Sequence, residues 1–180
     1  MLIRHADPAV DAASCAAIYG PYVSDTVISL EEQPPDEHEL RRRMQSITRF
    51  DPWLVAVSDG ALTGYAYASA HRERSAYRWA VDVTAYVDRE NRRRGTGRAL
   101  YCELLKLLRQ QGFHVACAGV TLPNQASVGF HEAFGFVPVG IYNRVAWKMG
   151  AWWDVGWWQL ELAEPTDGKP PDPRPAAELR

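Results

Sequence analysis

A strand that leads directly into an arginine- and glycine-rich loop and then into a long amphipathic helix is the feature that most constrains this chain. The strand is expected at 79–87, where β-branched and aromatic residues dominate. The loop at 92–98 reads RRRGTGR, and the helix after it carries leucines along one side. Unpaired N–H groups at a helix start, the positive end of the helix dipole and flexible glycines together favour an anion. The segment therefore predicts a phosphate site, to which the loop arginines add charge.

The loop differs from two familiar nucleotide-binding loops. It lacks the Lys-Ser/Thr pair of a Walker A loop and the G-x-G-x-x-G of a dinucleotide fold. ATP and NAD are therefore poor candidates for the phosphate-bearing ligand.

The remaining patterns predict strands interleaved with helices. Strands are expected at 2–4, 53–58, 61–70, 115–122 and in two last segments within 136–162, and helices at 8–19, 36–50 and 124–134. Asp59 and Gly60 predict a tight hairpin turn between two of the strands. Hairpins imply antiparallel neighbours and helical crossovers imply parallel ones. We therefore expect an α/β (α+β) fold in three layers, with a mixed sheet between helices.

Length, charge and composition narrow the class of protein. With 180 residues, 20 Lys+Arg and 22 Asp+Glu, the net charge is −2, which predicts one domain and no nucleic-acid or membrane-surface partner. The domain is expected at 1–162, and the proline-rich tail at 163–180 is expected to be poorly ordered. No apolar run is long enough to cross a bilayer, and the start does not resemble a signal peptide, so a cytoplasmic location is expected. The three cysteines are interpreted as buried thiols.

Two motifs carry a family resemblance. Arg92, Gly95 and Gly97 form R-x-x-G-x-G between a strand and an amphipathic helix, and Asn124 opens N-x-x-S-x-x-x-H-E-x-x-G-F, which ends at Phe136. The chain thereby resembles the GCN5-related N-acetyltransferase superfamily. The phrases PWLVA, AYRW, LPN, HEA and WDVG before WQL resemble the phosphinothricin and methionine sulfoximine N-acetyltransferase group.

The resemblance implies an acyl-CoA N-acyltransferase fold with a mixed, mostly antiparallel sheet, helices on both faces and a splayed central strand pair. A β-bulge on the strand at 79–87 is expected to cause the splaying. The implied co-substrate is acetyl-CoA, with no metal. The N–H groups at 85–87 would hold its thioester and pantetheine, the loop would surround its pyrophosphate, and one asparagine would contact it from the far side. These residues are Ala85, Tyr86, Val87, Arg92, Arg93, Arg94, Gly95, Thr96, Gly97, Arg98 and Asn124.

Two residues are candidates for catalysis. Asp82 occupies the position of a glutamate in the phosphinothricin enzymes and would assist removal of a proton from the amine. The alternative is a carboxylate paired with Arg78 or another arginine. His131 occupies the position of a tyrosine that protonates the coenzyme thiolate in many superfamily members. The alternative is a histidine hydrogen-bonded in place.

The acceptor site is expected next to Asp82. The implied residues are Arg74, Ser75, Ala76, Tyr77, Asp82 itself, Val83 and Thr84. Arg74 could hold a carboxylate or phosphinate, whereas Ile28-Ser29-Leu30 departs from the phosphinothricin enzymes, which have a phenylalanine there.

The predicted function is acetyl transfer from acetyl-CoA to the α-amine of a small amino acid analogue by direct attack. Alternatives are a polyamine, an aminoglycoside or a protein N-terminus as acceptor, or a non-catalytic acyl-CoA sensor. A tryptophan cluster at 147–158 favours a subunit interface, and the resemblance implies a homodimer.

Overall fold

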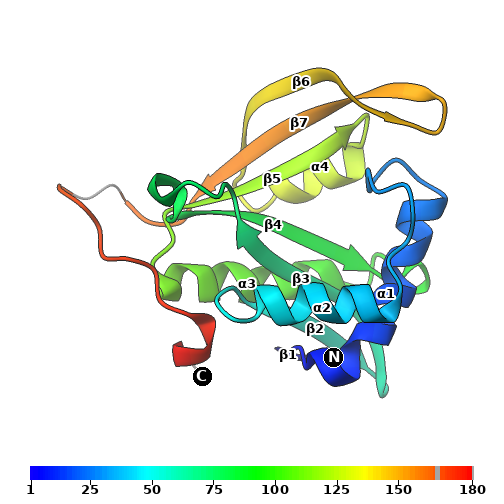
Figure 1. The fold of residues 1–180 in the computed structure, drawn as a ribbon, viewed down its shortest axis with the longest axis horizontal. Helices are drawn as coiled ribbons and strands as arrows, with labels where there is room; N and C mark the ends of the chain where they lie inside the picture. The colour runs from blue at the N-terminus through cyan, green and yellow to red at the C-terminus, as the bar shows by residue number, and fades with distance from the viewer. Residues whose placement is uncertain (165–166, 180) are drawn as a thin grey trace.

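A seven-stranded sheet forms the centre of the computed structural model (Figure 1), which describes residues 1–164 and 167–179. The strand order is β1-β2-β3-β4-β5-β7-β6, and only β4 and β5 are parallel neighbours. The strands are β1 (Leu2–His5), β2 (Trp53–Ser58), β3 (Ala61–Ala70), β4 (Ala80–Val87), β5 (Val115–Leu122), β6 (Val137–Lys148) and β7 (Ala151–Glu161). The expected mixed, mostly antiparallel sheet is confirmed.

Helices cover both faces of this sheet. They are α1 (Pro8–Ser24), α2 (Glu37–Ile47), α3 (Thr96–Gln111) and α4 (Gln125–Glu132), with short 3-10 turns η1 (Ser75–Tyr77), η2 (Arg89–Asn91) and η3 (Ala176–Leu179). The side chains of Asp7 and Asp36 accept hydrogen bonds from N–H groups in the first turns of α1 and α2, as capping aspartates do. Helix α1 continues past its expected end because Tyr22 and Val23 are buried in its last turn.

Two apolar clusters, one on each face, make the three layers. Cys15, Met44 and Trp53 belong to the cluster under α1 and α2, whereas Leu100 and Leu104 belong to the cluster under α3. Figure 1 shows α1 and α2 in front of the sheet and α3 behind it. The predicted three-layer fold is therefore confirmed.

The parallel pair β4 and β5 separates part-way along its length. The strands pair with each other only from Ala80 with Val115 to Asp82 with Cys117. Each strand then continues for five more residues without pairing with the other. The expected β-bulge on β4 is wrong, because β4 keeps one unbroken register against β3 from Val81 to Val87. The divergence instead reflects two half-sheets, since β4 stays with β3 while β5 stays with β7. We call the position of Asp82 and Cys117 the vertex.

The described part of the C-terminal tail packs against the domain, contrary to the poor order that its composition suggests. The Arg174 N–H donates to the Gln111 carbonyl, and the Gln111 side-chain amide donates to the Arg174 carbonyl. The Ala176 N–H donates to Phe50, and the indole N–H of Trp79 donates to Pro171. Backbone hydrogen bonds thus hold a segment that offers little apolar surface.

The cysteines differ in their exposure. Of the three cysteines, Cys15 is buried, Cys117 is half-buried and Cys102 is exposed on α3, so the interpretation of all three as buried thiols is wrong. No helix in the described residues is long and apolar enough to cross a membrane.

Candidate active site

A cleft of about 610 Å³ lies between the separated ends of β4 and β5 and the start of α3. Ten of the residues predicted to bind the cofactor line it: Ala85, Tyr86, Val87, Arg92, Arg93, Gly95, Thr96, Gly97, Arg98 and Asn124. Arg94 is exposed and is not among the lining residues. Val83, Thr84 and His131 also line the cleft.

The loop before α3 has the backbone of an anion site. Arg93 and Gly95 both have positive φ, at 61° and 84°, and Gly95 caps α3 without any side-chain hydrogen bond to the first turn. The N–H groups of that turn therefore keep their capacity to bind an anion. The guanidinium of Arg92 lies 5.1 Å from the ring centre of Tyr22, and that of Arg98 lies 5.7 Å from Phe134. Aromatic faces thus hold two cations beside the loop, and the site fits a pyrophosphate.

The free edge of β4 faces this cleft. Beyond Asp82 the strand keeps β3 on one side, so its N–H and C=O groups on the other side have no strand partner. Side chains alternate between faces: Val83 and Ala85 lie with the cluster under α3, and Tyr86 lies with the cluster under α1. The edge can therefore donate to an extended thioester chain placed in the gap.

His131 lies at the floor of the cleft with both ring nitrogens engaged. Nδ1 is 2.8 Å from the carbonyl of Ser127, which can only accept, so Nδ1 carries the proton. Nε2 then accepts from the Tyr101 hydroxyl at 3.0 Å. Burial lowers the pKa of His131, so the imidazole is neutral at pH 7.

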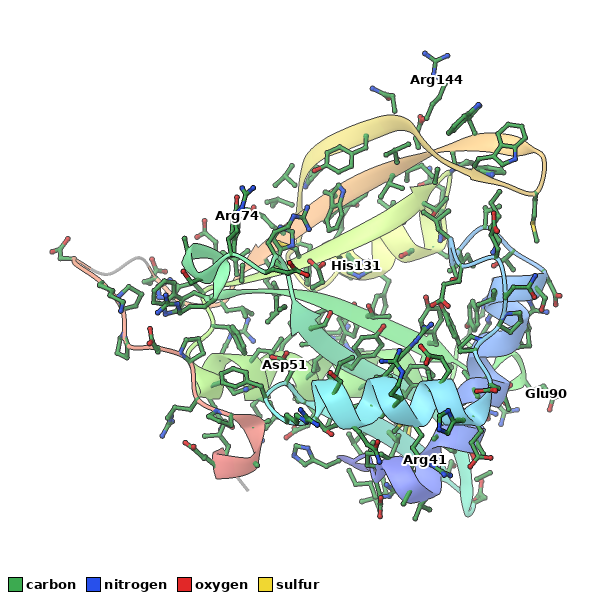
Figure 2. All side chains as sticks on the ribbon, viewed as in Figure 1. Arg41, Asp51, Arg74, Glu90, His131 and Arg144 are labelled. Atoms are coloured by element: carbon green, nitrogen blue, oxygen red, sulfur yellow. The ribbon has the colours of Figure 1, made fainter. Side chains whose placement is uncertain are left out.

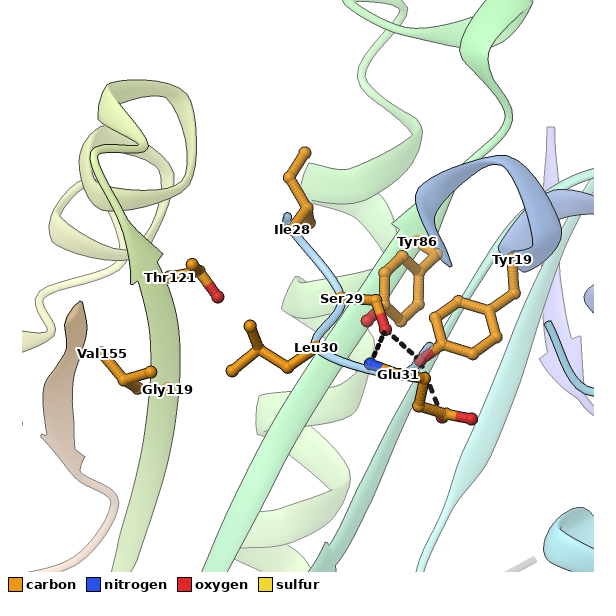
Figure 3. A pocket seen from close by; sticks show the side chains of 9 residues that line it. All are labelled: Tyr19, Ile28, Ser29, Leu30, Glu31, Tyr86, Gly119, Thr121 and Val155. Carbon is orange, nitrogen blue, oxygen red and sulfur yellow. Dashed lines mark hydrogen bonds between the residues drawn. The ribbon is translucent and has the colours of Figure 1, made fainter. Parts of the chain in front are cut away.

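A second cavity, of about 370 Å³, opens on the α1 side of the gap (Figure 3). Its residues are Tyr19, Ile28, Ser29, Leu30, Glu31, Tyr86, Gly119, Thr121 and Val155. Figure 3 shows the Ile28–Glu31 segment crossing between β5 and the aromatic rings of Tyr19 and Tyr86. Ile28, Tyr86, Gly119 and Thr121 line both cavities, so the two adjoin at the gap.

Polar contacts fix the Ile28–Glu31 segment. The Tyr19 hydroxyl lies 2.6 Å from the Ser29 hydroxyl and donates to Glu31 at 2.8 Å. Arg43 binds both carboxylate oxygens of Glu31, at 2.6 and 3.0 Å. The pKa of Glu31 is lowered by the hydrogen bonds from Arg43 and Tyr19, although burial opposes this. Arg43 thus faces inward, whereas arginines on a helix surface are usually solvated.

Lys148, at the end of β6, anchors the same segment although it lies more than a hundred residues further along the chain. Its Nζ donates to the carbonyls of Val23 and Ser29, at 2.6 and 2.7 Å, and the residue is 6% exposed. Burial lowers the pKa of this ammonium. These hydrogen bonds therefore connect the Ile28–Glu31 segment, which lines the second cavity, to the end of β6.

Asp82 lies at the vertex and lines neither cavity. Its Oδ1 is 2.6 Å from Nδ1 of His71, so the partner of this carboxylate is a histidine and not the arginine of the alternative interpretation. Burial raises the pKa of Asp82, and the hydrogen bond from His71 and the charge of Arg72 partly offset that effect. Cys117 completes the cluster: one nitrogen, one oxygen and one sulfur of the three residues lie within 4.8 Å of one another.

The loop predicted to border the acceptor lies apart from both cavities. Arg74, Ser75, Ala76 and Tyr77 are exposed and line neither of them. Figure 2 shows Arg74 projecting outward from the turn at η1. The ring of Tyr77 brings this loop near the vertex, because its centre is 6.0 Å from that of His71.

The profile of the family described as "Acetyltransferase (GNAT) domain" matches residues 4–157. The chain belongs to the GNAT acetyltransferases. The protein is 35% identical to a phosphinothricin N-acetyltransferase of Streptomyces viridochromogenes, over 92% of this chain and 90% of that protein. It is 32% identical to an L-methionine sulfoximine/L-methionine sulfone acetyltransferase of Salmonella typhimurium, over 91% and 96% of the two chains.

A solved structure agrees with this placement. The phosphinothricin acetyltransferase of Sinorhizobium meliloti in complex with AcCoA superposes with a TM-score of 0.89 at 37% identity, covering 95% of this chain and 93% of that one. As a GNAT enzyme, the protein is an acetyl-CoA-dependent N-acetyltransferase. The predicted enzyme class and co-substrate are confirmed.

Sequence reasoning missed several residues of this GNAT site. Tyr22, Asn91, Tyr101, Ser127 and Phe130 also line the first cavity. Spacing offered one signal, because Ser127 lies four residues before His131 on the same short helix. No sequence signal marked Tyr19, Glu31 or Val155 in the second cavity, because they come from elements far apart in the chain.

Proposed function

We propose that this enzyme acetylates the α-amine of a small amino acid analogue of the phosphinothricin, methionine sulfoximine or methionine sulfone type. One observation carries the proposal: a cavity of about 370 Å³ adjoins the cofactor cleft where β4 and β5 separate. A pocket of this size is in the range of small-ligand sites. The names of the relatives from Streptomyces viridochromogenes and Salmonella typhimurium support the same class of acceptor.

The reaction would proceed by direct attack of the neutral amine on the thioester carbonyl. The α-amino group of a chain terminus has a pKa of ~7.7 to 8.0, and the neighbouring carboxylate of a free amino acid analogue raises that pKa further, so a base must remove a proton before the attack. Asp82, on the cavity face of β4, would assist that removal together with the His71 ring to which it is hydrogen-bonded. N–H groups on the free edge of β4 would stabilise the developing oxyanion.

Most residues predicted to contact the co-substrate line the first cavity. The N–H groups around Ala85, Tyr86 and Val87 would hold the thioester and pantetheine, and the loop from Arg92 to Arg98 would hold the pyrophosphate. Asn124, which caps α4, would contact the co-substrate from the opposite side of the cleft. Arg94 would contribute charge at long range rather than a lining side chain.

The charge around the second cavity favours an amino acid analogue over a polyamine. Its one lining carboxylate, Glu31, is already neutralised by Arg43, and Arg72 lies near the vertex. A polycation would need carboxylates left free to bind it. An amino acid analogue instead carries anionic groups that Arg72 or Arg74 could attract from the rim.

His131 remains a candidate for protonating the departing thiolate. Its bond to Tyr101 makes a two-residue hydrogen-bonded path that ends in the cleft. A His131→Asn variant is expected to slow turnover while acetyl-CoA affinity stays within a few-fold.

We further propose that the enzyme works as a cytoplasmic homodimer. Strand β6 is an edge strand whose apolar side chains are about half exposed, among them Val137, Val139, Ile141, Val145 and Trp147 at 53–55%. A long apolar edge is a liability that a second copy of the chain would cover. Sedimentation equilibrium checks this, and a monomer at micromolar concentration would contradict it.

Free-thiol release from acetyl-CoA tests the proposed function. The panel contains L-phosphinothricin, L-methionine sulfoximine, L-methionine sulfone, the common amino acids, spermidine and an aminoglycoside. Release confined to the amino acids and their analogues supports the proposal. Release only with a cationic amine would leave the acetyltransferase assignment in place and overturn the acceptor. Acetyl-CoA binding with no release would favour a non-catalytic sensor.

A further inference from the structure

His71 lies on the same face of the sheet as the second cavity, where the acceptor is proposed to bind. It follows β3 directly, and its N–H donates to the Ala80 carbonyl, which continues the β3–β4 register by one more pair. Side chains alternate along strands, so His71, Ser69 and Asp82 lie on one face. Cys117 and Gly119 lie on that same face of β5, because Asp82 pairs with Cys117.

The ring of His71 adjoins the cavity wall through Trp157. The two rings meet edge to face at 5.8 Å between centres. Trp157 pairs with Gly119 across β5 and β7, and a Cβ on Gly119 would come within 3.3 Å of that indole. Since Gly119 lines both cavities, the imidazole is one aromatic ring away from the gap where acetyl transfer is expected.

The hydrogen bond to Asp82 selects one form of this imidazole. A carboxylate can only accept, so at 2.6 Å a proton lies on Nδ1 of His71, and in the neutral ring this leaves the lone pair on Nε2. Within the described residues, no hydrogen bond to Nε2 is recorded. The side chain of His71 is 16% exposed, so the ring is not sealed from solvent, and its edge-to-face contact with Trp157 places it next to the cavity wall.

The groups around His71 and Asp82 do not compete with them as proton acceptors. The thiol of Cys117 has its pKa raised to about 11 by burial and by the charge of Asp82, so it is protonated at neutral pH and is a poor nucleophile. Burial also raises the pKa of the Tyr67 hydroxyl, which therefore stays neutral. Arg72 contributes positive charge, and Tyr77 presents its ring to His71. The hydrogen-bonded carboxylate and imidazole are therefore the basic groups of the vertex.

We propose that His71 is the proton acceptor in acetyl transfer and that Asp82 is the positioning residue that orients it. The inference rests on the proposed function, and it changes which atom receives the proton. Asp82 is shorter than the glutamate that the resemblance leads one to expect, and the imidazole restores the missing reach.

The acceptor amine supplies both protons that the acetyl-transfer reaction moves. The acceptor ammonium gives one proton to Nε2 of His71, forming an imidazolium whose Nδ1–H stays bonded to Asp82. The neutral amine forms the C–N bond to the thioester carbon, and the C–S bond breaks to release the coenzyme thiolate. The second amine proton replaces the one that the Tyr101–His131 pair gives to that thiolate, and the imidazolium of His71 returns its proton to solvent.

Turnover of His71→Ala against pH tests the inference. At pH 7 the variant should lose on the order of 10²- to 10⁴-fold in kcat, the usual contribution of a general base, with the acetyl-CoA KM within a few-fold of wild type. At pH 9.5 a much larger fraction of the amine is already neutral in solution, so the loss should be much smaller than at pH 7. Added imidazole should restore part of the pH 7 rate. A loss of equal size at every pH, without rescue, would mean a structural role and overturn the inference.

Control variants distinguish the role of His71 from that of Asp82. His38→Ala removes an exposed histidine of α2 and should keep wild-type turnover with no response to imidazole. Asp82→Asn should slow wild type, yet cost almost nothing further in the His71→Ala background, because the two residues act as one unit. An equal cost in both backgrounds would show that Asp82 acts without His71. His71→Gln, which keeps more volume, repeats the test if His71→Ala folds poorly.

The protonation state of His71 can be measured without any acceptor, so it tests the role of His71 separately from the proposed acetylation. ¹⁵N NMR of the imidazoles in wild type should show His71 protonated at Nδ1 and bare at Nε2 at neutral pH, and Asp82→Asn should disturb that pattern. The opposite tautomer in wild type would overturn the inference. Absence of thiol release with every amine would instead refute the proposed function.

Discussion

Replacing Gly95 by aspartate or by asparagine separates charge from shape in the anion-binding loop. Gly95 has φ 84° and caps α3, and a Cβ placed there meets no atom within 4 Å. Asparagine and aspartate tolerate this backbone better than other L-residues and have nearly equal volume. Both variants should therefore carry a similar folding cost of about 1 kcal/mol, and only the aspartate variant adds negative charge at the expected pyrophosphate.

The expected loss follows from Coulomb's law. At an effective dielectric constant of about 20, two unit charges ~6 Å apart repel by roughly 3 kcal/mol, which corresponds to about 10²-fold in Kd. Loop arginines and salt reduce this repulsion, whereas the second charge of a pyrophosphate increases it. We expect Gly95→Asp to weaken acetyl-CoA binding by about 10²-fold relative to Gly95→Asn.

Isothermal titration calorimetry with acetyl-CoA measures the difference. Raising the salt from about 0.05 to about 0.5 M should narrow the gap between the variants, because exposed charges are screened. Thermal melts should place the two variants within about 2 °C of each other. Equal affinities for the aspartate and asparagine variants at low salt would refute the placement of the pyrophosphate at this loop.

Three other predictions concern stability. Lys148→Met leaves the carbonyls of Val23 and Ser29 without their buried donor, so urea denaturation should show a loss of about 2 to 4 kcal/mol, and the acceptor KM should rise while acetyl-CoA affinity stays unchanged. Burial raises the pKa of Asp51 from 3.8 to about 7, so the folded state holds a proton that the unfolded state releases, and stability falls as pH rises from about 4 to 7. Asp51→Asn should remove that fall and give a higher Tm than wild type at pH 8 but not at pH 4; parallel Tm curves would contradict the assignment. Truncation after residue 163 breaks the hydrogen bonds between Gln111 and the tail and should lower Tm by several degrees without changing kcat, whereas an unchanged Tm would show that the tail contributes no stability.

The order and the type of the elements could be predicted from local patterns. Runs of β-branched and aromatic residues marked the strand at 79–87, Asp7 and Asp36 marked helix starts, and Asp59-Gly60 marked a turn in which both residues have positive φ. The cofactor loop was equally local, since its glycines and arginines are consecutive. These features depend on residues a few positions apart, which is why one sequence suffices for them.

Contacts between distant segments could not be predicted. The bond between His71 and Asp82 depends on the register of β3 against β4, and the pairing of Glu31 with Arg43 depends on how α2 packs beside an irregular segment. The tail appeared unable to order itself because it has few apolar side chains. Its order depends on backbone hydrogen bonds to Gln111 and Phe50, which composition does not reveal.

The most direct test of the central claim is identification of the product with L-methionine sulfoximine as acceptor. After incubation with acetyl-CoA and the wild-type enzyme, mass spectrometry and NMR should show one acetyl group on the α-nitrogen, in molar balance with the thiol released. A matched acceptor whose α-amine is already acetylated should give no release. Acetylation at another atom, or thiol release that continues with the blocked acceptor, would contradict transfer to an α-amine held at the gap between β4 and β5.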